Sequence, residues 1–171
     1  MNKKILIHIG DITTLKVDAI VNAANKPLRG GGGVDGRIHE VAGPQLLEEC
    51  RSLNGCRTGS AKITNAYKLP CHKVIHAVGP IYDSSKKEES ADLLASCYKT
   101  SLTIAAASNL KTIAFSCLST GVYRYPNKEA ACIALSTVRK FLQGPDGHEI
   151  EQVIFCLFLR KDVDVYLDYI P

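Results

Sequence analysis

Two segments of the chain combine glycine with polar residues in a way that could hold a diphosphate. The first, residues 22–36, contains four consecutive glycines at positions 30–33. Glycine loses more backbone entropy on folding than any other residue, so such a run needs a physical reason. A bare backbone lets main-chain N–H groups approach a phosphate, and a helix predicted from Val34 would add the positive end of its dipole. A tight surface turn is the alternative interpretation.

The second segment, residues 116–126, contains Ser119, Thr120, Gly121 and Tyr123. Here too a predicted strand leads into a loop with glycine and hydroxyl side chains, and a helix is predicted to open near Asn127. Taken alone, this could be an ordinary connection between a strand and a helix. Two such loops at one edge of a sheet, however, could hold a diphosphate between them.

Asp35 is the residue of the first segment that could do chemistry. In the first turn of a helix, a carboxylate is stabilised by the helix dipole by about 0.3–1 kcal/mol, and this could be its whole role. Beside a bound diphosphate, the like charge would raise its pKa and make it a better proton acceptor for a water molecule. His39 follows by four residues, so the two side chains would share a helix face, and a structural role at the pocket edge is favoured for it.

Short β-branched apolar runs alternate along the chain with longer stretches of helical periodicity, which is typical of an α/β domain. Strands are predicted at residues 5–9, 19–21, 61–64, 74–77, 112–116 and 152–157, and helices at residues 34–42, 44–53, 91–107, 127–141 and 163–169. Ser90 is the predicted N-cap of the third helix, and Asn109 lies near its end. Because several strands are almost continuously apolar, we expect a largely parallel or mixed sheet between helices, with a ligand site beyond the carboxyl ends of the strands.

Composition narrows the class of protein further. The chain has 171 residues, 46% of them hydrophobic and 22% charged, which predicts one soluble globular domain over residues 1–171. The net charge of +4 is mild and the basic residues are scattered, so nucleic-acid binding is not indicated. No segment approaches the roughly 20 apolar residues of a membrane span. Seven cysteines, an odd number, favour a reducing compartment such as the cytoplasm.

The sequence does not support several other well-known functional motifs. Gly31, Gly33 and Gly36 formally match the glycine pattern of dinucleotide-binding folds, but no strand ending in an acidic residue follows at the required distance. A Walker P-loop is absent, because no Gly-Lys-Ser/Thr follows the glycines. The cysteines and histidines lack zinc spacing, so we expect neither a metal nor a cofactor. Cys117 has no indicated histidine partner, and buried packing is the favoured role for it.

Six short motifs, in order, match one family. They are Gly10-Asp11-Ile12-Thr13, Asn22-Ala23-Ala24-Asn25, the segment from Gly30 to Gly36 followed by Ile38-His39, Ala42-Gly43-Pro44, His76-Ala77-Val78-Gly79-Pro80 and Ser119-Thr120-Gly121-Val122-Tyr123. On these residues the chain resembles the macrodomain superfamily, and within it the MacroD-type ADP-ribose hydrolases, over residues 5–166. The resemblance implies a three-layer α/β/α fold with a mixed, mostly parallel six-stranded sheet.

The resemblance also implies a set of site residues for ADP-ribose. Asp11 would accept a hydrogen bond from the adenine amino group beside Ile12, and Phe158 would pack against adenine. Asn25 would orient the distal ribose, and Asp35 would be tied to hydrolysis. The remaining ligand-binding positions are Asn22, Gly32, Gly33, Val34, Ser119, Thr120, Gly121, Val122 and, over the distal ribose, Tyr123.

The implied activity is removal of mono-ADP-ribose from acidic side chains of proteins and deacetylation of O-acetyl-ADP-ribose. Water would attack the ester carbonyl or the anomeric carbon with help from Asp35. No metal or cofactor would be needed, and the protein would act as a monomer. Three residues depart from the family pattern: Arg37 replaces a small residue, Arg124 a glycine and Ser116 a proline. A non-catalytic module that only binds ADP-ribose is the second interpretation, and binding of RNA or poly-ADP-ribose through the scattered basic residues is a third.

Overall fold

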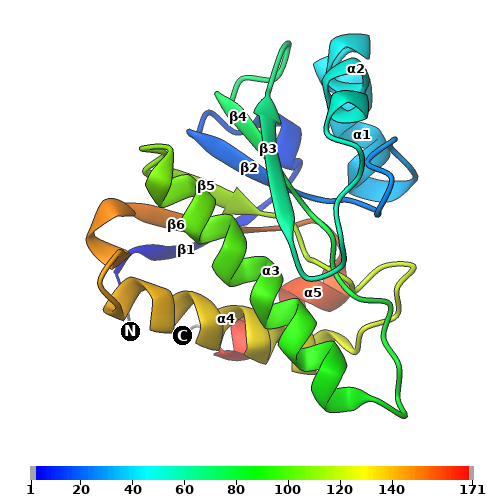
Figure 1. The fold of residues 1–171 in the computed structure, drawn as a ribbon. Coiled ribbons are helices and arrows are strands. Elements are labelled where there is room, and N and C mark those ends of the chain that lie inside the picture. Colours follow the sequence, from blue (N-terminus) through cyan, green and yellow to red (C-terminus); the bar gives the residue numbers. More distant parts are fainter. Residues whose placement is uncertain (1–2, 170–171) are drawn as a thin grey trace.

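Six strands form one sheet in the computed structural model, which describes residues 3–169 (Figure 1). The spatial order is β1-β6-β5-β2-β4-β3, and every neighbouring pair is parallel except β3 with β4. The strands are β1 (Ile5–Ile9), β2 (Ala19–Ala23), β3 (Ala61–Asn65), β4 (Lys73–Ala77), β5 (Thr112–Phe115) and β6 (Gln152–Leu157). The predicted mixed, mostly parallel sheet is confirmed.

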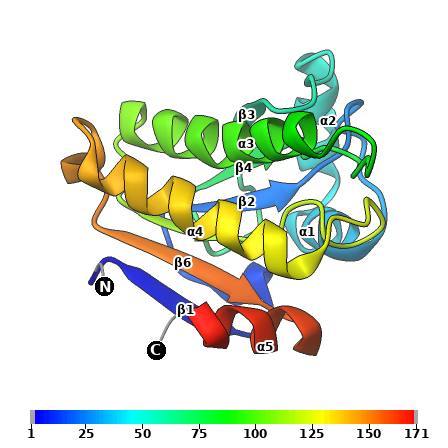
Figure 2. The same ribbon diagram turned by 90° about the horizontal axis from the view of Figure 1, so that it is seen from below.

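Helices cover both faces of this sheet (Figure 2). They are α1 (Gly33–Ala42), α2 (Pro44–Ser52), α3 (Lys87–Ala107), α4 (Asn127–Gln143) and α5 (Arg160–Tyr169), with short 3-10 turns η1 (Ile12–Thr14) and η2 (Gly147–Glu149). Alternate strand residues point to opposite faces, so Phe115 packs with α3, α4 and α5, whereas its neighbour Ala114 packs with α1 and α2. The two layers therefore bury both faces of the central strands, which explains their almost continuous apolar sequence.

The start of α3 differs from the prediction. The helix begins at Lys87 rather than residue 91, and Ser90 lies buried within its first turn instead of serving as the N-cap. The hydroxyl of Ser90 accepts a hydrogen bond from the backbone N–H of Asp83 at 3.3 Å. Glu88 and Glu89 occupy the first turn, where the helix dipole stabilises carboxylates. The other residues of the extra turn, Lys87, Glu88 and Glu89, are charged and exposed, so the turn has no apolar periodicity from which a helix could be predicted.

Strand order decides where the two glycine-bearing segments lie. Since β2 and β5 are adjacent and parallel, the segments that follow them leave the same edge of the sheet. The ends of β6 and β1 continue this edge, and Gly10 N–H donates to Leu157 O at 2.9 Å just beyond their last paired residues. Among residues 3–169, no helix is both long and apolar enough to cross a membrane.

Candidate functional site

A cleft of about 310 Å³ opens between the two glycine-bearing segments at the carboxyl edge of the sheet. The first segment contributes one wall and the second contributes the other, and Gly79, just after β4, also lines the cleft. The lining residues are Ala23, Ala24, Asn25, Gly31, Gly32, Gly33, Val34, Asp35, Gly79, Cys117, Ser119, Gly121, Val122 and Tyr123. The structure therefore brings together the two segments that the sequence predicted to meet.

The glycines of the two segments serve two different purposes. A Cβ atom added to Gly32, Gly33 or Gly121 would meet no atom within 4 Å, so the backbone at these positions borders open space. At Gly36, in contrast, a Cβ would collide with the carbonyl oxygen of Gly31. Gly36 is thus required for packing of α1 against its own approach segment, whereas Gly32, Gly33 and Gly121 leave room for a ligand to reach main-chain N–H groups.

Asp35 lies in the first turn of α1 and borders the cleft while being only 5% exposed. Its Oδ1 accepts a hydrogen bond from Asn22 Nδ2 at 2.7 Å and lies 3.4 Å from His39 Nε2. Its Oδ2 has no hydrogen-bond partner among residues 3–169. Burial raises the pKa of Asp35, although the Asn22 hydrogen bond and His39 act in the opposite direction. A carboxyl with a raised pKa and one free oxygen is suited to accept a proton from water.

Behind Asp35 runs a buried chain of hydrogen bonds. Asn22 on β2 is in register with His76 on β4, and Asn22 Nδ2 lies 3.2 Å from His76 Nδ1. His76 Nε2 lies 2.9 Å from the hydroxyl of Thr64, which in turn donates to the carbonyl of Asn65 at 3.0 Å. Burial, followed by repulsion from His39, lowers the pKa of His76 to about 3, so its ring is neutral. Because an amide nitrogen only donates, Nδ1 of His76 accepts and Nε2 carries the proton.

Two buried polar atoms at the cleft have no hydrogen-bond partner among residues 3–169: Asn25 Oδ1 and Ser119 Oγ. The side-chain amide of Asn25 is held through its nitrogen, since Nδ2 donates to Gly30 O at 3.1 Å. Ser119 has a φ of 65°, which is uncommon for a residue with a side chain. Buried polar atoms are normally satisfied, so these two are suited to pair with hydroxyl or phosphate groups of a ligand.

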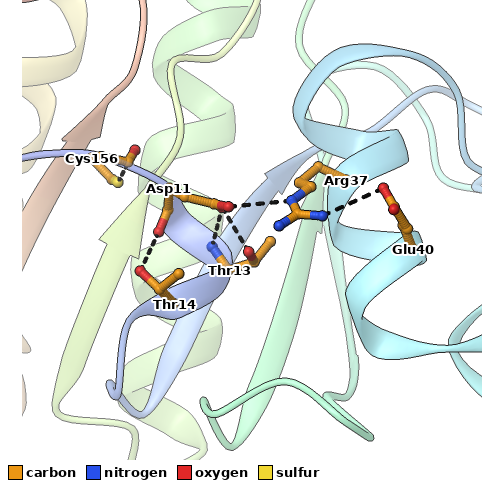
Figure 3. A network of polar contacts seen from close by, with 7 residues as sticks. Asp11, Thr13, Thr14, Arg37, Glu40 and Cys156 are labelled. Atoms are coloured by element: carbon orange, nitrogen blue, oxygen red, sulfur yellow. Dashed lines mark hydrogen bonds and ion pairs between the residues drawn. The ribbon is translucent and has the colours of Figure 1, made fainter.

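A second polar cluster lies at the end of β1 (Figure 3). Asp11 Oδ1 accepts hydrogen bonds from Thr13 N at 2.9 Å and Thr13 Oγ1 at 2.6 Å, and Oδ2 accepts from Arg37 Nε at 3.2 Å. Arg37 also lies 3.5 Å from Glu40 on the next turn of α1. Burial would raise the pKa of Asp11, but the bonds from Thr13 and Arg37 outweigh it and lower that pKa. Arg37, which departs from the family pattern, thus contacts the carboxylate predicted to bind adenine.

Nine of the predicted site residues line the cleft, namely Asn25, Gly32, Gly33, Val34, Asp35, Ser119, Gly121, Val122 and Tyr123. The other five lie outside its lining. Asn22 is buried beneath Asp35, and Thr120 is buried with its carbonyl accepting from Lys161 Nζ at 3.2 Å. Ile12 is buried beside Asp11 in η1, and Phe158 is 77% exposed just after β6. Their individual ligand contacts stay predictions.

Sequence reasoning missed two features of the site. Gly79 lies against the second segment, where a Cβ atom would collide with the hydroxyl of Ser119. The contact between Asn22 and His76 was the second missed feature, although both are polar residues within otherwise apolar strands. A buried polar side chain needs a partner, so the presence of one in each of two neighbouring strands could have indicated that they pair. Only the register between β2 and β4 pairs them.

Two side predictions can be placed in the structure. Arg124 has a φ of 60°, so the position where the family commonly has glycine does require left-handed backbone. Burial, and after it the negative charge of the neighbouring Asp162, raise the pKa of the Cys117 thiol well above its ordinary value. A nucleophilic thiolate is therefore disfavoured at this position. Among residues 3–169, no group of three or more histidine, cysteine or acidic side chains is arranged to hold a metal ion.

Comparison with known proteins gives a consistent result. The family model described as Macro domain matches residues 21–134. ADP-ribose glycohydrolase MACROD2 of Homo sapiens is 52% identical over 166 residues, which cover 97% of this chain but 39% of that protein. Macro domain-containing protein CT2219 of Chlorobaculum tepidum is 56% identical over 168 residues, covering 97% of this chain and 96% of that protein. The chain thus spans about two fifths of the human relative.

Solved structures agree with the sequence relatives. The Trypanosoma brucei macrodomain in complex with ADP-ribose superposes with a TM-score of 0.92 at 43% identity, covering 99% of this chain and 70% of that one. The Oceanobacillus iheyensis macrodomain with ADP gives a TM-score of 0.87 at 40% identity, covering 95% of this chain and 87% of that one. The chain therefore belongs to the macro domain family.

Proposed function

We propose that this protein binds ADP-ribose and hydrolyses its esters, removing mono-ADP-ribose from acidic side chains of proteins and deacetylating O-acetyl-ADP-ribose. One observation carries the proposal: the buried Asp35 carboxyl opens into the same cleft that the two glycine-bearing segments form. The names of the relatives support it, because MACROD2 of Homo sapiens is called an ADP-ribose glycohydrolase. A Trypanosoma brucei macrodomain of similar structure was solved with ADP-ribose.

In this proposal the diphosphate lies between the two segments. Main-chain N–H groups at Gly32 and Gly33, at the positive end of the α1 dipole, face one side of it, and the segment of Ser119 and Gly121 faces the other. The open space beside the three glycines is what such close approach requires. Adenine then extends along the sheet edge toward Asp11 and Phe158, and the distal ribose lies near Asn25, Tyr123 and Asp35.

Asp35 acts as the general base. The Asn22 hydrogen bond fixes Oδ1, which leaves Oδ2 to accept a proton from water in the cleft. The water oxygen bonds either to the ester carbonyl carbon or to the anomeric carbon of the ribose, and the ester bond to that carbon breaks. The proton passes to the departing oxygen, so the products are ADP-ribose and a free carboxylic acid by either route. Hydrolysis in water labelled with ¹⁸O separates the routes, because carbonyl attack places the label in the released carboxyl group.

The test is incubation of the protein with a peptide that carries one labelled mono-ADP-ribose on a glutamate. Time-dependent release of ADP-ribose supports the proposal. Retained label with measurable ADP-ribose affinity would leave a module that only binds. Affinity that collapses with salt and is unaffected by Asp11→Ala would instead favour recognition of a polyanion such as RNA.

We also propose that the protein works as a monomer in a reducing compartment such as the cytoplasm. All seven cysteines are free thiols, and Cys132 alone among them is exposed, which supports a reducing environment. Light scattering after size-exclusion chromatography measures the oligomeric state directly.

A further inference from the structure

A second recess lies beside the cleft, outside its lining residues. It has a volume of about 490 Å³ and is lined by Lys26, Pro27, Arg29, Arg51, Asn54 and Gly55, a set called the basic recess below. One wall is the turn that follows Asn25, and the other is the end of α2. The walls are joined where Cys56 N–H donates to Lys26 O at 2.8 Å.

The basic recess and the cleft share one wall. Asn25 lines the cleft and the next residue, Lys26, lines the recess, while at the other end of the turn Arg29 lines the recess and Gly31 lines the cleft. This turn is firmly held, because Leu28 N–H donates to Asn25 O at 3.0 Å and the Leu28 side chain is 1% exposed. The backbone that carries Lys26 and Arg29 is therefore fixed next to the cleft residues Asn25 and Gly31.

The charges of the basic recess are not neutralised within residues 3–169. Lys26, Arg29 and Arg51 are exposed, and none forms an ion pair or a side-chain hydrogen bond with another described residue. Glu49, an acidic side chain on α2, is engaged elsewhere, since it accepts from Asn65 N at 3.0 Å and Tyr67 OH at 2.7 Å. Like charges gathered in one recess repel one another, so an acidic partner would relieve an existing unfavourable interaction.

We infer that the basic recess binds an acidic segment of the ADP-ribosylated protein, next to the modified side chain. The inference rests on the proposed function, in which the distal ribose lies near Asn25 and Asp35. The polypeptide attached to that ribose must leave the cleft past its rim, where Lys26 and Arg29 stand. Guanidinium groups such as those of Arg29 and Arg51 bind carboxylates with two parallel hydrogen bonds.

The exposed position of these cations sets the size of the effect. Exposed ion pairs contribute little each and are screened by salt, so the recess should favour acidic substrates without dominating the affinity for ADP-ribose. Three such contacts together correspond to about a five- to tenfold preference in kcat/KM at low salt. Free ADP-ribose, which has no attached segment, should be unaffected.

The test compares two peptides that carry mono-ADP-ribose on one glutamate, one flanked by aspartate and glutamate and the other by serine and glutamine. Wild-type protein should hydrolyse the acidic peptide about five- to tenfold more efficiently at about 50 mM salt, and the preference should shrink at about 500 mM. The triple variant Lys26→Glu, Arg29→Glu, Arg51→Glu should lose or reverse the preference. Its Kd for ADP-ribose and its turnover of O-acetyl-ADP-ribose should remain within about twofold of wild type.

A matched control is the triple variant Lys87→Glu, Lys99→Glu, Lys140→Glu, which makes the same change of net charge with exposed residues of α3 and α4. It should keep the preference for the acidic peptide. Equal rates for both peptides with wild type, or an equal loss of preference in the control, would overturn the inference while leaving the proposed function intact. Tight binding of an RNA oligonucleotide to the recess, with no peptide preference, would overturn it as well. Failure to hydrolyse either peptide would overturn the proposed function itself.

Discussion

Asn22 and Asp35 are joined by a buried hydrogen bond, from Nδ2 to Oδ1 at 2.7 Å. The bond connects β2 to the first turn of α1, and thereby fixes the carboxyl relative to the edge of the sheet. Asn22 is itself held against His76 on the neighbouring strand. The proposed general base is therefore held by a side chain from the centre of the sheet.

Removing this bond should change the pH dependence of turnover. In Asn22→Ala, Asp35 loses a donor that lowers its pKa, so the acidic limb of the kcat/KM profile should move to higher pH. We also expect kcat to fall by about tenfold or more, because the carboxyl is no longer held in place. Rates measured between about pH 5 and 9 test this, with His72→Ala, an exposed site, as control. An acidic limb at the wild-type pH would contradict the assigned role of Asn22.

A substitution at Gly32 can test the proposed diphosphate site without disturbing the fold. Its φ of −87° and ψ of −177° suit any residue, and a Cβ would project into open space. Gly32→Val should therefore leave the melting temperature within about 2 °C but weaken ADP-ribose binding by about tenfold or more. Gly36→Ala is the contrasting variant, which should destabilise the fold because its Cβ meets the Gly31 carbonyl. Unchanged affinity in Gly32→Val would argue against a ligand at this position.

Substitution of Asp11 and substitution of Arg37, which are paired in Figure 3, should differ in their effect on ADP-ribose binding. Asp11→Ala removes the predicted acceptor for adenine and should weaken ADP-ribose binding by about tenfold. Arg37→Ala removes one partner of a half-exposed ion pair, which contributes little, so the change should stay within about threefold. Calorimetry with ADP-ribose measures both. A larger loss of affinity in Arg37→Ala than in Asp11→Ala would show that the Arg37 guanidinium, and not the Asp11 carboxylate, binds adenine.

Burial of Asp35 should also appear as a cost in stability. Folding raises its pKa above the value of about 3.9 found in unfolded chains. Below that pH the carboxyl is protonated in both states, and stability is then lost as the pH rises through the folded-state pKa. Asp35→Asn does not titrate, so its advantage in melting temperature over wild type should grow from about pH 4 to about pH 8. Asp92→Asn, at an exposed site on α3, serves as the control for the substitution itself. A constant difference between Asp35→Asn and wild type would contradict the raised pKa.

The fold was largely predictable because strand and helix periodicities in this chain are strong and local. The predicted bounds of all six strands lie within two residues of the observed ones, and two strand-loop-helix segments at one sheet edge indicate the cleft. What could not be predicted depends on contacts between distant segments. The sequence shows that Arg37 departs from the family pattern, but its bond to Asp11 requires α1 to lie beside the end of β1. The pairing of Asn22 with His76 likewise requires strand register, which the sequence does not specify.

The most direct test of the account is a paired measurement on wild type and Asp35→Ala. Turnover of a mono-ADP-ribosylated glutamate peptide is followed alongside calorimetric titration with ADP-ribose. We predict that wild type binds and hydrolyses, and that Asp35→Ala loses turnover while its Kd stays within about tenfold, or about 1.4 kcal/mol. Hydrolysis by Asp35→Ala at the wild-type rate, or no heat from wild type with ADP-ribose, would contradict the account.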